Sequence, residues 1–198
     1  MSATGGRKIF LSASVPLPSR NPVYSQTADF VAIRDAIRAL TMVVIEERAE
    51  LVFGGHPAIT PMVRLQIAQS GTRVSDLFVL FQSRYFQSAF PTDNSSFARL
   101  HLVDEVRGDR DASLARMRQQ MLNESLDGGF FIGGMEGVEQ EYSLFQNLHP
   151  NSPAFPIAST GAAAARLFGS DPILMRNHPE LRDEISYLNL MRYLVSVL

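Results

Sequence analysis

One stretch decides the fold: Phe130-Phe131-Ile132-Gly133-Gly134-Met135-Glu136-Gly137-Val138-Glu139-Gln140-Glu141-Tyr142. Its apolar start is typical of a buried strand, and a helical pattern over 136–147 begins directly after the glycine pair. Gly133 and Gly134 can adopt backbone angles that are closed to other residues, and they let a ligand approach the main chain. A strand, a glycine pair and a helix N-terminus predict an anion site, because free N–H groups and the helix dipole face the ligand.

Three acids, Glu136, Glu139 and Glu141, follow this glycine pair. They favour the start of the helix electrostatically, but they would repel a phosphate placed very close to them. We therefore expect at least one of these acids to meet a ligand hydroxyl instead. For Glu141 the alternative is an ordinary exposed glutamate at a helix start.

The composition is that of an ordinary globular protein, and we expect a single domain over residues 1–198. The net charge of −2 and the lack of a Lys/Arg cluster make nucleic acid an improbable partner. The absence of cysteine excludes disulfides, thiolate zinc sites and cysteine nucleophiles. No apolar run has membrane-spanning length, and the small polar tail 1–6, expected to be disordered, has no signal-peptide core. A cytoplasmic protein without a membrane partner is expected.

Apolar runs and helical patterns alternate along the chain. The expected strands cover 7–14, 51–53, 76–81, 97–103, 130–132 and 153–158, and the expected helices cover 27–50, 58–70, 113–124, 136–147, 161–168 and 179–198. Prolines predict a loop at 15–26, and 82–94 is expected to be a loop with a short helix. This alternation predicts an α/β protein, a Rossmann-like three-layer α/β/α sandwich with a mostly parallel sheet.

Ligands of such sheets bind beyond the carboxyl ends of the strands. Glycines, hydroxyl residues and other polar side chains follow five of the expected strands. These candidate ligand-binding residues are Ser12, Ser14, Gly54, Gly55, His56, Gln82, Arg84, Arg110, Gly133, Gly134, Met135, Glu136, Gly137 and Thr160. The pattern favours a phosphate-bearing ligand, although it is neither a Walker loop nor the dinucleotide GxGxxG fingerprint. A single glycine pair alone is equally typical of a tight strand-to-helix turn.

Individual residues have simpler alternatives. His56 either contacts phosphate or base, or has a structural role in its loop. Arg84, Arg110 and Arg118 suit phosphate, while each alone is more typical of a surface salt bridge. The other histidines lack the spacing of metal ligands, so no metal site and no cofactor are expected.

The order of these motifs resembles the SLOG superfamily, named for the Smf/DprA and LOG (lysine-decarboxylase-like) proteins. Phe53-Gly54-Gly55 resembles the family's first glycine-rich turn. The stretch 133–141 resembles the second, PGGxGTxxE, with one residue inserted. The resemblance implies a Rossmann-like fold over residues 7–168 and a nucleotide-related ligand.

LOG enzymes hydrolyse nucleoside 5′-monophosphates, and the resemblance places Glu141 at the position of their catalytic glutamate. Val138 replaces the family threonine and Ile132 the proline. The catalytic arginine aligns with Met117, and Arg118 follows one position later. These departures resemble the nucleotide-sensor modules of bacterial defence systems, some of which bind NAD-derived nucleotides and control an effector.

Two functions from different classes follow from the resemblance. The first is a sensor of a nucleotide-derived molecule, NAD- or ADP-ribose-derived or related, with a separate effector protein. The alternative is a LOG-like phosphoribohydrolase or a related N-glycosidic bond enzyme, with Glu141 and Arg118 as catalytic residues. A purely structural subunit would need an occluded glycine-rich edge.

The apolar stripe of the expected C-terminal helix is either core or the seam of a homodimer or homotetramer. Its members are Leu181, Ile185, Leu188, Met191, Leu194, Val195 and Leu198.

Overall fold

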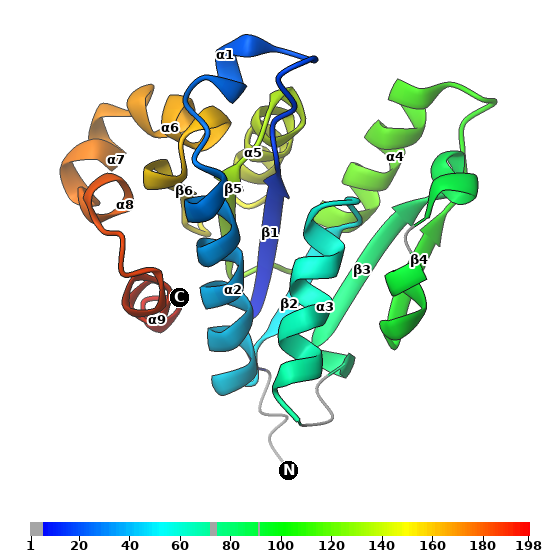
Figure 1. The fold of residues 1–198 in the computed structure, drawn as a ribbon, viewed down its shortest axis with the longest axis horizontal. Helices are drawn as coiled ribbons and strands as arrows, with labels where there is room; N and C mark the ends of the chain where they lie inside the picture. Colours follow the sequence, from blue (N-terminus) through cyan, green and yellow to red (C-terminus); the bar gives the residue numbers. More distant parts are fainter. Residues whose placement is uncertain (1–5, 72–74, 91) are drawn as a thin grey trace.

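The computed structural model describes residues 6–71, 75–90 and 92–198, so most of the predicted tail 1–6 lies outside the described residues. These residues form one parallel sheet with strand order β4-β3-β2-β1-β5-β6 (Figure 1). The strands are β1 (Lys8–Ser14), β2 (Glu50–Gly54), β3 (Phe78–Ser83), β4 (Arg99–Val103), β5 (Gly128–Gly133) and β6 (Ala154–Ile157). All neighbouring pairs are parallel. The predicted α/β class is confirmed.

The helices lie on both faces of this sheet. They are α1 (Pro22–Ser25), α2 (Phe30–Glu46), α3 (Ile59–Gln69), α4 (Arg110–Leu122), α5 (Glu136–Leu148), α6 (Ala162–Gly169), α7 (Pro172–Asn177), α8 (Glu180–Asp183) and α9 (Tyr187–Ser196). Short 3₁₀ segments connect several of them. The three-layer α/β/α sandwich predicted from the sequence is therefore the observed architecture.

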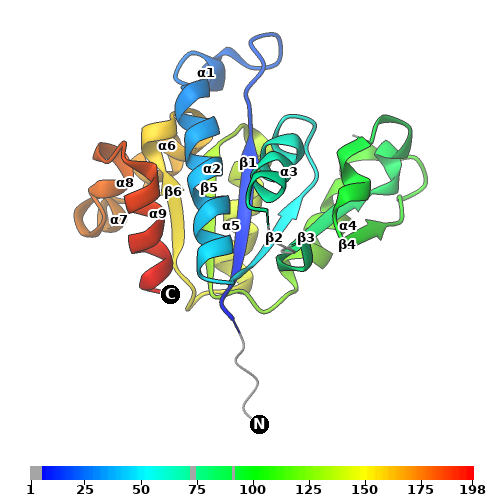
Figure 2. The same cartoon turned by 60° about the horizontal axis from the view of Figure 1, so that its bottom comes forward.

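Side chains of each strand alternate between two hydrophobic layers. From β1, Ile9 and Leu11 pack with α2, α3 and α9, whereas Phe10 packs with α4 and α5 on the other face. Figure 2 shows α9 beside α2, with β1 between α2 and α3 in that view. Asp29 fixes the start of α2, because its carboxylate accepts hydrogen bonds from the amides of Val31 and Ala32, both at 2.9 Å.

Three local predictions are wrong. The expected loop 15–26 contains α1, which Asn21 caps and Pro22 opens. The expected loop from residue 82 begins too early, because Gln82 and Ser83 belong to β3. The expected single helix 179–198 is broken into α8 and α9, since Glu184 adopts an extended backbone (φ −86°, ψ 128°). A further helix, α7, was not expected.

The apolar stripe near the C-terminus is mostly core. Met191, Leu194 and Val195 are fully buried in the layer that contains α2. Ile185 and Val197, in contrast, remain exposed. Assembly through this region stays a prediction, and few residues of the stripe remain available for it.

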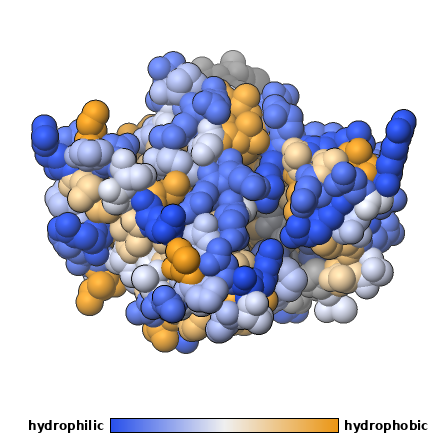
Figure 3. Space-filling model, turned by 90° about the horizontal axis from the view of Figure 1, so that it is seen from above, coloured by the Kyte–Doolittle hydropathy of each residue, from blue (hydrophilic) through white to orange (hydrophobic). Residues whose placement is uncertain are grey.

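The order of the strands creates a switch point. From β1 the chain builds the sheet outward through β2, β3 and β4, and it then returns to place β5 on the other side of β1. The loops after β1 and β5 therefore leave toward opposite faces of the sheet, and ligands of parallel α/β sheets commonly bind between such loops at the carboxyl ends of the strands. These ends lie at the top of Figure 1. Seen from above, this face is mainly hydrophilic, with apolar residues in separate small groups (Figure 3).

Candidate functional site

The glycine pair at the end of β5, Gly133 and Gly134, forms the turn at the switch point. Gly133 and Gly134 have positive φ values of 58° and 90°, which residues with a side chain rarely adopt. A Cβ atom at Gly134 would lie 2.3 Å from Cγ2 of Val138. The Gly133 amide donates to Thr160 Oγ1, and the Gly134 amide donates to the Ser14 carbonyl oxygen, both at 2.9 Å. These glycines are required by the turn itself.

The amides available to a ligand are consequently fewer than the sequence suggested. Those of Gly133 and Gly134 are used within the protein, so the predicted phosphate contact narrows to the amides of Met135, Glu136 and Gly137, of which the Glu136 amide also donates to its own carboxylate. These amides belong to the start of α5, where no intrahelical acceptor exists. Phosphate binding there stays a prediction.

Glu141 is the centre of the polar contacts at the switch point. Its Oε2 accepts a hydrogen bond of 2.6 Å from Ser12 Oγ, and its Oε1 accepts one of 3.1 Å from Arg118 Nε. Nη1 of Arg118 donates to Gln140 Oε1 at 2.7 Å. The side chains of Arg118 and Glu141 are only 16% and 15% exposed. Such partly desolvated, charge-assisted contacts are stronger than those of an exposed surface pair.

The structure shows which residue of α4 reaches Glu141. The resemblance aligned the family's arginine with Met117, one position before Arg118. The side chain of Met117, on α4, is buried in the core, whereas the side chain of the next residue, Arg118, extends to Glu141. A Cβ atom at Gly137 would lie 3.0 Å from Nη2 of Arg118, so this nitrogen is beside the first turn of α5. Within the part of the chain that the structure describes, Nη2 has no hydrogen-bond partner. The guanidinium is therefore held through Nε and Nη1, while Nη2 lies beside the start of α5.

The other two acids of α5 bind the loop after β1. Glu136 accepts a 2.7 Å hydrogen bond from Asn21, which is the main cause of its lowered pKa. Glu139 accepts from the Tyr24 hydroxyl at 3.0 Å and from Arg166 Nε at 3.1 Å. All three carboxylates thus have partners in the protein, and the expected contact of one acid with a ligand hydroxyl stays a prediction.

The first glycine pair has a packing role. The Gly55 amide donates to the Phe81 carbonyl oxygen at 2.8 Å. A Cβ atom at Gly55 would lie 1.9 Å from Nε2 of the buried Gln82. Gly54 ends β2, where Met117 Cε would be 3.5 Å from an added Cβ. Both glycines therefore allow close packing between β2, β3 and α4, and their contact with a ligand stays a prediction.

His56 is held within the loop that leads to α3. Its amide donates to Thr60 Oγ1 at 3.1 Å, and its Nδ1 accepts from the Ala58 amide at 3.2 Å. Burial, and to a lesser extent nearby Arg20, lowers the pKa of His56. These contacts support the structural alternative and favour a neutral ring.

Two predicted arginines form surface ion pairs. Arg84 pairs with Asp104 at 3.0 Å, and Arg110 pairs with its neighbour Asp111 at 2.8 Å. Both arginines are exposed and lie on the side of the sheet that contains β3, β4 and the start of α4. Their roles as ligand contacts stay predictions, and the structure favours the alternative for each.

Several polar contacts of the site have no counterpart in the sequence prediction. Gln140 holds Arg118, and Asn21 and Arg166 hold the acids of α5. Arg20 contributes to the lowered pKa values of both His56 and Glu136, so it lies near the same switch point. No motif marks these residues, and only the predicted convergence of the β1 and β5 loops pointed toward them.

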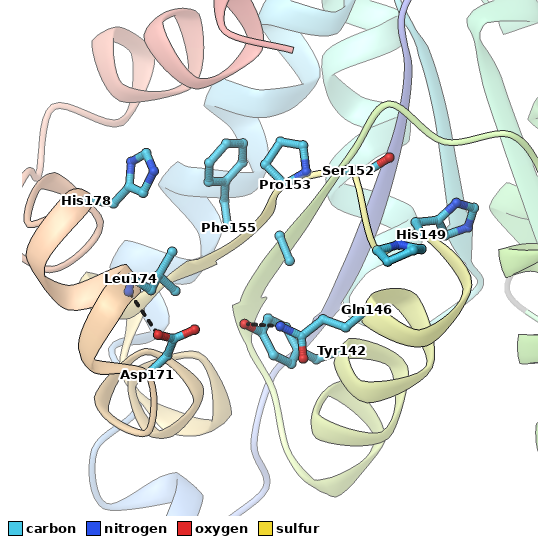
Figure 4. Close-up of a pocket in the computed structure, with 11 residues that line it drawn as sticks. Tyr142, Gln146, His149, Ser152, Pro153, Phe155, Asp171, Leu174 and His178 are labelled. Carbon is cyan, nitrogen blue, oxygen red and sulfur yellow. Dashed lines mark hydrogen bonds between the residues drawn. The ribbon is translucent and has the colours of Figure 1, made fainter.

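A hollow lies away from the switch point. It has a volume of about 300 Å³ and lies between α5, the start of β6 and α7 (Figure 4). Among the described residues, no group of three or more His, Asp or Glu side chains is arranged to hold a metal ion. In the same part of the chain, no helix is both long and apolar enough to cross a membrane.

The SLOG cluster3 family matches residues 23–195, which is most of the chain. The chain belongs to this family. The predicted SLOG membership is thus confirmed, and the match begins after β1, so that Ser12 and Ser14 precede it. The family and fold together support a nucleotide-related Rossmann-like protein.

A solved structure shows the same fold. The X-ray structure of TM1055, a target of the Northeast Structural Genomics Consortium, is similar to this chain with a TM-score of 0.56 and 14% sequence identity. The similarity covers 82% of this chain and 81% of TM1055. No curated protein matches the chain. At this identity the likeness concerns the fold alone.

Proposed function

We propose that this SLOG protein binds a nucleotide-derived small molecule, of the NAD- or ADP-ribose-derived kind, and acts as a ligand sensor. The observation that carries the proposal is the contact of Glu141 with both Ser12 and Arg118 at the switch point. A carboxylate and a guanidinium beside a helix N-terminus offer complementary groups to a sugar and a phosphate.

In the proposed complex, Glu141 accepts hydrogen bonds from ribose hydroxyls. Nη2 of Arg118 and the amides of Met135 to Gly137 donate to the phosphate. Each carboxylate oxygen has a second lone pair, so Glu141 can keep Ser12 and Arg118 while it binds the sugar. A sensor needs a ligand that distinguishes two states, and the Arg118–Glu141 pair, which joins α4 to α5, is the contact that such a ligand would change.

The second candidate function is a nucleoside 5′-monophosphate phosphoribohydrolase or a related N-glycosidic bond enzyme. It is favoured by the position of Arg118, which reaches Glu141 despite the offset in the alignment. In that case Glu141 would stabilise the positive charge that develops on the ribosyl group, and Arg118 would orient the sugar. Val138 in place of the family threonine favours the sensor, because it removes a hydroxyl next to the phosphate.

The partners also belong to this proposal. As a sensor, the protein would act through a separate effector protein or through a change of assembly, as a homodimer or homotetramer. A bacterial defence setting and a cytoplasmic location fit such a role.

Calorimetric titration with ADP-ribose and with AMP tests the proposal. We expect Glu141→Gln to abolish binding, because the amide can no longer accept from both Ser12 and the ligand with full charge. Glu47→Gln is the matched control, since Glu47 is half-exposed, pairs with Arg7 at 3.9 Å and is distant from the switch point in the fold. Equal affinity of the wild-type protein and Glu141→Gln would contradict the proposed site. Rapid release of adenine from AMP, lost in Glu141→Gln, would establish the enzyme instead.

A further inference from the structure

The hollow between α5, β6 and α7 differs in chemistry from the switch point. Its side walls come from α5 and α7, and the start of β6 forms its back (Figure 4). The volume of about 300 Å³ is at the lower end of the range for small-molecule sites. Neither lysine nor arginine lines it. The two histidines of its lining already have partners, His149 the Leu122 carbonyl oxygen and His178 the Glu180 carboxylate, so the hollow is poorly suited to a phosphate.

Two polar side chains face each other across this hollow, Tyr142 from α5 and Asp171 before α7 (Figure 4). Oδ1 of Asp171 caps α7 by accepting from the amides of Ile173 and Leu174 at 3.0 and 2.9 Å. Oδ2 of Asp171 has no partner within residues 6–71, 75–90 and 92–198. The Tyr142 hydroxyl accepts from Gln146 Nε2 at 3.1 Å and retains its own proton. Burial, and then Asp171, raises the pKa of Tyr142 to about 12.

The polar groups therefore offer a negative charge and neutral acceptors to an occupant. Asp171 supplies the charge, and the side-chain oxygen of Gln146 remains an acceptor. Apolar contacts come from Leu174 and from Phe155, which the His178 ring approaches at 5.7 Å. This combination suits a compact cation with an apolar body, which can donate N–H bonds while its carbon atoms contact the walls.

A peptide strand is a less suitable occupant, although β6 is an edge of the sheet. The Gly129 amide donates to the Pro153 carbonyl oxygen at 2.9 Å. In a parallel pair the backbone groups of alternate residues face the neighbouring strand. The N–H and C=O of Phe155 therefore point toward β5, and the backbone groups of Ala154 and Pro156 point away from it. Because Pro156 has no N–H, an added strand would lose one of its hydrogen bonds. The edge is thus poorly suited to strand addition.

We infer that the hollow between α5, β6 and α7 is a second ligand site, separate from the switch point, for a small organic cation with an amidinium or ammonium group. The cation donates to Oδ2 of Asp171 and to Gln146, and its apolar part lies against Leu174 and Pro153. The Tyr142 hydroxyl limits the depth of the site and donates to any acceptor on the ligand. This inference is independent of the proposed nucleotide site.

Benzamidine, a planar amidinium, and benzamide, its neutral isostere, are the probes of the test. Both are titrated into the ¹⁵N-labelled full chain and followed by NMR. We expect benzamidine to shift the amide signals of Asp171 to Leu174 and of Gln146, and benzamide to bind about tenfold more weakly or not at all, as expected for loss of a hydrogen bond to a charged group. Shifts elsewhere, or none at millimolar benzamidine, would overturn the inference.

Asp171→Asn is the decisive variant, because asparagine caps a helix as well as aspartate does while it removes the charge. We expect benzamidine affinity to fall about tenfold in Asp171→Asn and to persist in Glu141→Gln, which changes only the switch point. Equal affinity in Asp171→Asn would refute the site. Loss of nucleotide binding in Glu141→Gln, or its absence in all variants, bears only on the proposed function.

Discussion

Two neighbouring residues of α5 lie in different surroundings. Glu141 is at the switch point, where Ser12 and Arg118 bind its two carboxylate oxygens. Tyr142 is in the hollow beside β6, where a neutral hydroxyl faces the carboxylate of Asp171. One region contains Arg118 beside a helix start and suits an anion, and the other contains the Asp171 carboxylate without a lysine or arginine and suits a cation. The charge of the partner side chains, more than the size of the cavity, decides what each region can bind.

The largest effect is expected where the switch point is built. Gly134→Val should destabilise the protein by about 3 kcal/mol or more, because the side chain would strain a positive φ and collide with buried Val138. Urea unfolding measures the loss. Gly169→Ala is the control, since an added Cβ at this end of α6 meets no atom within 4 Å, and we expect little change. A stable Gly134→Val protein would show that the turn tolerates another geometry.

A smaller loss is expected from removing the acid of the switch point. Glu141→Ala should cost about 2 kcal/mol, because Arg118 would remain mostly buried without its partner. The free energy of unfolding from urea titration checks this value. Glu47→Ala, which breaks an exposed pair, should change stability by less than about 0.5 kcal/mol. Equal effects of the two variants would mean that the Arg118–Glu141 pair is no stronger than a surface contact.

Removing Asp171, the acid of the hollow, should destabilise the protein less than Glu141→Ala does. Asp171→Ala should destabilise the protein by about 1 kcal/mol, since α7 loses its cap. Asp171→Asn should be nearly neutral in the absence of a ligand. Thermal unfolding of the two variants separates the cap from the charge. Destabilisation by Asp171→Asn as large as by Asp171→Ala would show that the carboxylate has a structural charge partner.

The smallest effect is confined to alkaline pH. The pKa of Tyr142 is about 12 in the folded protein, raised from 10.0 mainly by burial and then by Asp171. Its contribution to stability is complete below pH 10 and is lost between pH 10 and about 12, because the unfolded chain ionises first. Tyr142→Phe should therefore show a shallower loss of stability over that interval in urea titrations. Identical slopes for both proteins would indicate that the hydroxyl is not desolvated.

The sequence predicted the parallel sheet and its convergent strand ends, because apolar periodicity and glycine positions act locally. Gly133 and Gly134 were expected to form a special turn, and their positive φ values confirm it. The break between α8 and α9 was not predictable from the apolar stripe, because Ile185 continues the pattern while Glu184 is extended.

The candidate site was predictable only in part. Glu141 followed from the resemblance to the LOG motif, but the same resemblance aligned the family's arginine with Met117 rather than with Arg118. A helix turns about 100° per residue, so an offset of one residue places a side chain on a different face of α4. Only the packing of α4 in the structure shows that Arg118, and not Met117, faces Glu141. The contacts of Gln140 and Asn21 depend on elements distant in the chain, and single-residue patterns contain no signal for them.

A crystal structure of the protein with ADP-ribose tests the central claim most directly. We expect a ribose hydroxyl within hydrogen-bonding distance of the Glu141 carboxylate, and a phosphate facing Arg118 and the amides of Met135 to Gly137. ADP-ribose bound elsewhere, or a switch point that stays free of ligand at saturating concentration, would contradict the claim.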